Sequence, residues 1–239
     1  MLECKTVAIP LEITMRSKQS GFTLVEIAIV LVIIGLLLGG VLKGQELINS
    51  AKVKNLITDF RSVSTFVYAY QDRFRALPGD DRDAVGHVGA TANAAAANLG
   101  NGRINGNWNS AAANNAVGNV DESARFWEQV RRAGLASGDP VIGNAGYLYT
   151  NADGGNVGIT GDPVFTGAGG WPATFYVCSA GIQGRYARQI DTTIDDGNTT
   201  TGTVRVLGTA AGGELATSAN FYAVTPADDA TLFTVCVAY

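Results

Sequence analysis

The chain has 239 residues and a formal net charge of -4; 16% of its residues are charged and 30 are glycines. This length suits one sizeable domain with an appendage better than two large domains. The charged share lies below the usual value of about a quarter, which indicates a loop-rich surface suited to exposure outside the cytoplasm. Lys and Arg do not gather in any long stretch, so the composition argues against a nucleic-acid-binding face.

The first part of the chain, residues 1–21, is expected to be a leader. Residues 1–14 show neither helical periodicity nor a useful charge pattern, so Met15 is expected to be the true start. Arg16 and Lys18 stand just before an apolar segment, and such positive charge stays on the cytoplasmic side of a membrane. The residues that follow the apolar segment should therefore lie outside the cytoplasm.

Residues 22–42 form this apolar segment, and Glu26 is its single charged residue. A helix of this length spans about 30 Å, which matches the hydrocarbon core of a bilayer. An ordinary signal peptide is shorter and ends in small residues, whereas a simple membrane anchor fits the hydrophobicity but leaves Glu26 unexplained. A lone carboxylate within a span costs about 2.5–3.5 kcal/mol, so Glu26 is expected to be functional.

A regular apolar stripe follows between Gly44 and Pro78, with neither Gly nor Pro inside it. Its members recur at alternating steps of three and four residues, as on one side of a helix. They are Val53, Leu56, Phe60, Val63, Val67, Tyr70, Phe74 and Leu77. We therefore predict one long helix over residues 22–77, whose second half packs this stripe against a globular head over residues 78–239.

The head is predicted to be an antiparallel sheet laid over the long helix, which gives an α+β fold. Residues 86–120 are rich in Ala, Asn and Gly and are interpreted as a long loop. Residues 121–135 carry apolar side chains at helical spacing and are expected to form a short second helix. Apolar runs bounded by turn-forming residues are expected to be strands, at residues 147–149, 173–178, 203–207 and 231–239.

The stretch from Gly21 to Glu26 reads Gly-Phe-Thr-Leu-Val-Glu, with basic residues before it and the apolar segment after it. This arrangement closely resembles the cleavage signal of type IV prepilins and type II secretion pseudopilins, and the resemblance is strong over residues 15–80. It implies that an inner-membrane prepilin peptidase cuts between Gly21 and Phe22 on the cytoplasmic side and methylates the new Phe22 amine. It also implies that Glu26 takes part in assembly and that the head has the pilin fold.

Glu26 has a physical reason to act in assembly. A carboxylate buried in a helix bundle is tolerated when it is paired with an opposite charge. The Phe22 amine of a neighbouring subunit, created by cleavage, would supply that charge. Such a pair sets register more than it adds stability, so it would align each incoming subunit with the one before it.

The chain has three cysteines, and Cys4 lies in the leader that processing would remove. Cys178 and Cys236 fall in two predicted strands, and a disulfide between them would be worth about 4 kcal/mol in the entropy model. Many type IV pilins staple their C-terminal region in a similar way, and the expected compartment is oxidising. Two free buried thiols are the alternative.

No cofactor is expected, although one stretch of the head offers oxygen ligands of the kind that calcium binds. Its spacing is not that of an EF-hand, and the sequence Asp-Gly-Asn is also an ordinary turn composition. The candidate ligands are Asp191, Asp195, Asp196 and Asn198.

No catalytic site is predicted, so the chain is not expected to be an enzyme. His87 is the only histidine and lies in a Gly-rich loop, where it is interpreted as incidental. No pair of nucleophile and base, and no cluster of metal ligands, stands at a recognisable spacing. Asp80, Asp81 and Asp83, which follow the long helix, are interpreted as a solvated turn.

Residues and resemblance together predict a structural subunit of a type IV pilus-like filament, which polymerises with its own copies and with other pilins. The precursor is expected to cross the inner membrane once with its head in the periplasm. An assembly platform in that membrane would then deliver it to an extracellular or periplasmic filament. The alternatives are a pseudopilin of a type II secretion system and a membrane-anchored minor pilin whose head serves adhesion or DNA uptake.

Overall fold

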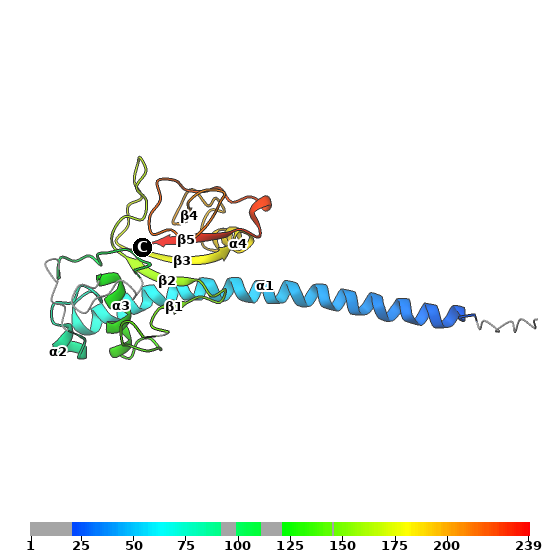
Figure 1. Ribbon diagram of the computed structural model, residues 1–239, viewed down its shortest axis with the longest axis horizontal. Helices are drawn as coiled ribbons and strands as arrows, with labels where there is room; N and C mark the ends of the chain where they lie inside the picture. Colours follow the sequence, from blue (N-terminus) through cyan, green and yellow to red (C-terminus); the bar gives the residue numbers. More distant parts are fainter. Residues whose placement is uncertain (1–20, 92–98, 111–120, 145) are drawn as a thin grey trace, which may run out of the picture. The chain divides into compact units, whose positions relative to one another are not determined.

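The computed structural model describes residues 21–91, 99–110, 121–144 and 146–239 (Figure 1). Apart from Gly21, the expected leader lies outside the described residues. The chain forms two compact units, which divide between Glu46 and Leu47. The expected fold class is confirmed: the protein combines a long N-terminal helix with an antiparallel sheet in a pilin-like α+β arrangement.

Helix α1 (Leu24–Phe74) has 51 residues, and its bounds nearly match those of the helix predicted over residues 22–77. No glycine or proline interrupts its second half. It ends where Arg75 takes a left-handed backbone conformation, with φ +57°. Such a residue just after the last helical turn is a common way for a helix to stop.

The predicted apolar stripe of α1 is buried in the second unit. Six of its members are at most 3% exposed: Val53, Leu56, Phe60, Val63, Val67 and Tyr70. Phe74 and Leu77, at the end of the stripe, are only partly buried. The first five of the six pack in one core with sheet residues such as Val157 and Val177. The helix therefore supplies one wall of the head.

The sheet has five antiparallel strands in the order β1-β2-β3-β5-β4 (Figure 1). Their bounds are β1 (Tyr149–Thr150), β2 (Asn156–Thr160), β3 (Tyr176–Gln183), β4 (Val204–Leu207) and β5 (Leu232–Ala238). Strand β5 lies between β3 and β4, although β4 precedes it in the chain.

The two faces of the sheet belong to different cores. Along β3, Val177 packs in the core that contains α1, while Tyr176 and Cys178 pack in a second cluster with Trp108 and Trp171. This alternation is the period of two that a strand buried on both faces shows. The sheet is thus covered on its outer face by loop residues instead of being solvated.

Two of the predicted strands need correction. The strand expected at residues 173–178 runs instead from Tyr176 to Gln183, and its register with β5 shifts between Ser179 and Ile182. Gly181 sits in this irregularity with φ +69°, a conformation that glycine adopts without strain. Strand β1 is Tyr149–Thr150, where residues 147–149 were expected.

Strand β2 was not predicted. A glycine, Gly158, stands in its middle and weakens the β signal of the sequence. The backbone explains this residue, because a Cβ at Gly158 would lie 1.9 Å from the carbonyl oxygen of Trp108. The loop that carries Trp108 therefore crosses the strand too closely for any side chain.

The helices of the head agree with the sequence in part. Helix α3 (Glu122–Arg132) confirms the second helix expected over residues 121–135. Helix α2 (Ala84–Val88) begins just before the predicted loop at 86–120 and overlaps it, and residues 92–98 and 111–120 of that loop lie outside the described residues. Helix α4 (Gly184–Ile194) and a short 3-10 helix, η2 (Pro226–Asp228), were not predicted.

The interpretation of Asp80 and Asp81 as part of a solvated turn is wrong, because each is only 3% exposed. Asp80 accepts hydrogen bonds from the backbone amides of Gly100 and Gly102. Asp81 accepts a hydrogen bond of 2.7 Å from the Tyr70 hydroxyl. These carboxylates tie the loop after α1 to the head, a role that local composition does not reveal. Asp83 is exposed, as expected.

His87 also has a structural place. Its Nδ1 lies 2.7 Å from Asp81 Oδ2. Its ring stacks on Phe74, with 5.2 Å between the ring centroids. Helix α2 is thereby held against the end of α1.

Candidate functional site

The candidate site is the start of α1, where the sequence predicts cleavage. Gly21 and Phe22 are exposed and non-helical, and Phe22 is 79% exposed. A Cβ built on Gly21 would meet nothing within 4 Å. The peptide bond between Gly21 and Phe22 therefore lies in open backbone, the kind of segment that proteases cut most readily.

The helix begins immediately after this bond, and its first turn has a cap. The Thr23 hydroxyl oxygen accepts a hydrogen bond of 3.2 Å from the backbone amide of Glu26. Thr-x-x-Glu is the sequence signature of a capping box, so this role of Thr23 could have been predicted from the sequence. An acidic residue in the first turn also suits the positive end of the helix dipole.

The first unit of the structure presents an apolar surface. An 18-residue window within α1 has a mean hydropathy of 2.8, and none of it is buried. Leu24, Leu31, Leu36 and Leu37 are each more than 60% exposed. By length and composition α1 can cross a membrane.

Open backbone at Gly21, an acid in the first turn and an apolar helix are thus joined in one segment. Residues 16–42 match the family model of the prokaryotic N-terminal methylation motif. This N-terminal methylation motif is the prepilin-type motif of type IV pilins and pseudopilins. No curated protein and no solved structure matches the chain.

The N-terminal methylation motif supports a type IV pilin-like or pseudopilin protein, and it points to a structural subunit. Together with α1 it fits a membrane-anchored precursor. The motif also implies processing by prepilin peptidase and assembly with other pilins. The cut after Gly21, the methylation of Phe22 and the role of Glu26 in assembly stay predictions.

The predicted disulfide is present between Cys178 and Cys236. The two residues are direct partners in the register of β3 and β5, and their Cα atoms are 4.1 Å apart. Both side chains are fully buried in the cluster on the outer face of the sheet. The bond therefore fastens two central strands to each other.

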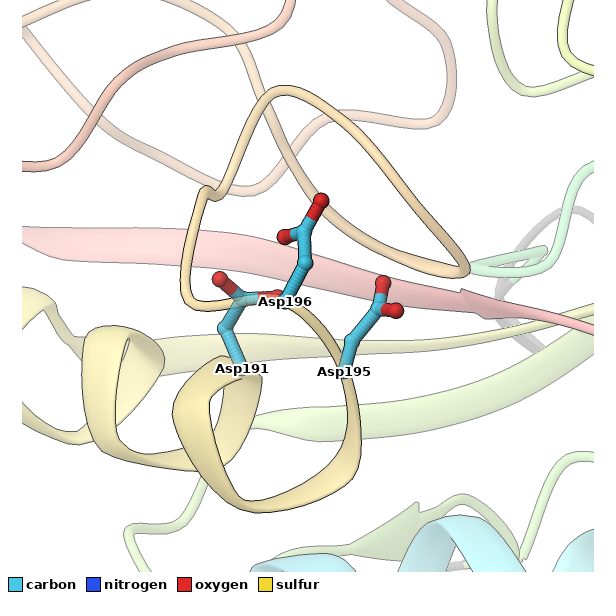
Figure 2. A group of neighbouring side chains, drawn as sticks. All are labelled: Asp191, Asp195 and Asp196. Atoms are coloured by element: carbon cyan, nitrogen blue, oxygen red, sulfur yellow. The ribbon is translucent and has the colours of Figure 1, made fainter.

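Three of the four calcium candidates lie together, at the end of α4 (Figure 2). Asp191 is in the last turn of the helix and Asp195 is its C-cap residue. One carboxylate oxygen from each of Asp191, Asp195 and Asp196 lies within 4.8 Å of the other two. The side-chain oxygen of the fourth candidate, Asn198, accepts a hydrogen bond of 2.8 Å from the Thr200 hydroxyl.

The segment that holds these residues is not simply a turn, as its composition had indicated. Asp191 is buried inside the helix with 0% of its surface exposed. Burial, with a smaller contribution from the nearby charges of Asp196 and Asp195, raises the pKa of Asp191 to about 6. Ordinary turn chemistry holds only for the later part, where the backbone amide of Asn198 bonds Asp196 at 2.8 Å.

A second buried carboxylate belongs to Glu122, the first residue of α3, which is 6% exposed. It accepts a hydrogen bond of 2.8 Å from the backbone amide of Asn105. Burial raises the pKa of Glu122 to about 7, and nearby carboxylates such as Asp80 and Asp162 add to this shift. Its native site therefore favours the protonated form.

This raised pKa predicts that the protein loses stability as pH rises. The unfolded chain releases the Glu122 proton near pH 4.5 and the folded chain near pH 7, so the stabilisation is complete below 4.5 and lost above 7. At about 1.4 kcal/mol per pH unit, the loss reaches at most about 3 kcal/mol. A Glu122→Gln variant keeps an acceptor for Asn105 and should lose less stability over this range.

Urea unfolding of the full chain in detergent from pH 5 to pH 8 measures this difference. Glu214→Gln, at an exposed residue, is the matched control and should follow the wild type. Equal losses in Glu122→Gln and the wild type would show that Glu122 does not carry the pH dependence.

Proposed function

We propose that the chain is the precursor of a filament subunit, which is cut after Gly21, methylated on Phe22 and polymerised through α1. The observation that carries this proposal is the N-terminal methylation motif at residues 16–42. The helix that the motif opens is exposed and apolar, as storage in a membrane requires.

Assembly would replace lipid by protein around the apolar half of α1. Side chains in lipid gain little from leaving it, so helices associate there through close packing and polar contacts. Gly35, Gly39 and Gly40 have open surroundings in the single chain, since a Cβ on any of them would meet nothing within 4 Å. Such residues allow the backbones of neighbouring subunits to approach each other closely.

Glu26 would then supply the polar contact. Within 22–42 it is the one charged side chain, and it lies in the first turn of the helix. The amine freed at Phe22 of a neighbouring subunit is the opposite charge that would make its burial tolerable. We expect this pair to fix the axial step between subunits.

Processing is tested by the mass of the N-terminal peptide after coexpression with a prepilin peptidase. The wild type should begin at Phe22 and carry one methyl group on its amine. Gly21→Val should remain uncut, because a branched side chain replaces the open glycine backbone at the cut. Gly35→Ala, a substitution within the same unit, should be processed like the wild type.

An uncut wild-type chain, or a mature chain that begins elsewhere than Phe22, would overturn the proposal. Filament shearing then separates the kinds of subunit. Abundant sheared fibres of this chain are expected for the main subunit of a pilus, whereas trace incorporation would indicate a minor subunit.

A further inference from the structure

The carboxylate of Asp191 has no partner within the part of the chain that the structure describes. The side chain is fully buried, and neither of its oxygen atoms accepts a hydrogen bond. A buried charge without a hydrogen bond or an ion pair is strongly unfavourable. The last turn of helix α4 therefore holds a buried carboxylate that a bound cation would stabilise.

Two further carboxylates, those of Asp195 and Asp196, lie beside it (Figure 2). Asp195 is held by the backbone amides of Thr203 and Val204, the second at 3.0 Å. Asp196 is held by the Thr201 hydroxyl at 2.6 Å. These bonds fix the carboxylates in place. Both bonds to Asp195 go to Oδ2, which leaves its Oδ1 for another contact, and Asp196 Oδ2 keeps a second lone pair.

The charge of this group is not neutralised by its own helix. The C-terminal end of a helix carries partial negative charge, and the last turn of α4 contains no basic residue. The charge of Arg205 acts on Asp195 and Asp196, but Arg205 forms no ion pair with any of the three carboxylates in the described residues. Its guanidinium instead stacks over Phe221, 4.6 Å from the ring centroid, and donates to the Gly202 carbonyl oxygen.

We propose that Asp191, Asp195 and Asp196 bind a divalent cation of the calcium class. Calcium takes six to eight oxygen ligands at about 2.3–2.6 Å, so two oxygens bound to one ion can lie up to about 5 Å apart. The observed limit of 4.8 Å between the three oxygens is compatible with a single ion. Calcium also accepts irregular geometry, whereas magnesium demands a near-ideal octahedron.

The arrangement gives the ion a route and a structural effect. Exposure rises from the buried Asp191 through the half-buried Asp195 to the exposed Asp196, so the ion enters from the Asp196 side. Binding joins the end of α4 to the loop that leads into β4, because Asp195 already bonds the backbone at Thr203 and Val204. The ion thus stabilises the edge of the sheet.

Calcium alone is the probe, added to the full-length chain in detergent after treatment with a chelator. Isothermal titration should show one site with a Kd below about 1 mM, within the range of extracellular calcium modules. Calcium should also raise the melting temperature. Asp191→Asn should weaken binding at least about tenfold and remove the thermal shift, since it takes away the one fully buried ligand charge.

Asp196→Asn, at an exposed position, is the second variant and should weaken binding even if Asp191→Asn does not fold. Asp72→Asn, at an exposed residue of α1, is the control and should bind like the wild type. A wild type that takes up no calcium at millimolar concentration overturns the proposal. Binding by both Asp191→Asn and Asp196→Asn at wild-type affinity overturns it as well. Neither result bears on cleavage after Gly21 or on filament assembly.

Discussion

Replacing Glu26 with Gln is expected to lower filament assembly at least about tenfold while cleavage after Gly21 continues. A glutamine suits the third position of a capping box as well as a glutamate does, so the start of α1 is preserved. The variant removes only the negative charge, and the buried Phe22 amine of the neighbouring subunit then lacks a partner. Breaking a buried ion pair in this way costs about 3–5 kcal/mol, which is more than a tenfold effect.

Assembly is measured as the amount of this chain in sheared filaments, with the processed subunit in the membrane as the reference. Glu46→Gln is the control, because Glu46 is exposed and forms a surface pair with Lys43 that contributes little. Wild-type assembly of Glu26→Gln would show that the charge is not used. A Glu26→Ala variant that alone fails would assign Glu26 to the cap of the helix.

Removing the disulfide by Cys178→Ser together with Cys236→Ser is expected to lower the free energy of unfolding by about 4 kcal/mol. The two residues are 58 positions apart, and closing a loop of that size restricts the unfolded chain by about this amount in the entropy model. Both cysteine side chains are fully buried in one cluster with Trp108 and Trp171, so the substitutions also disturb the packing of the outer face of the sheet.

Chemical unfolding in the presence and absence of a reductant measures this contribution. Reductant should destabilise the wild type to the level of the double variant and leave the double variant unchanged. Cys178→Ser alone should lose about as much stability as the double variant, since the bond needs both sulfurs. A double variant within about 1 kcal/mol of the wild type would contradict the prediction.

Much of α1 could be predicted because its signals are local and repeated. The stripe from Val53 to Tyr70 follows helical spacing without a break, and its members from Val53 to Val67 are the ones that pack in one core with the sheet. The disulfide could be predicted because the chain has only two cysteines after the leader, each in an apolar run. Helical periodicity and the number of cysteines are properties of the sequence alone, so both inferences needed no knowledge of the tertiary structure.

The parts that were missed depend on contacts that the sequence does not display. Gly158 weakens the signal of β2, and its cause is the Trp108 backbone far away in the chain. Asp80 and Asp81 have the composition of an exposed turn, yet amides and hydroxyls from other segments make their burial favourable. At these positions, contacts with distant parts of the chain determine whether a residue is buried.

Helix α4 is a different case, because its signal was present. Tyr186, Ala187 and Ile190 stand at helical spacing and are buried on one side. No helix was predicted there, because the acidic residues that follow have the composition of a turn. The sequence predicted the three residues of the candidate cation site as possible ligands. The burial of Asp191, on which the proposal depends, could be found only from the structure.

The position of β5 in the sheet limits the order in which the strands can pair as the chain folds. Strand β4 has no neighbour in the described sheet except β5, which comes later in the chain. A head that folds from its N-terminal side can pair β1, β2 and β3 early, but β4 must wait for β5. The disulfide between Cys178 and Cys236 has to wait for the same strand, because β5 carries Cys236.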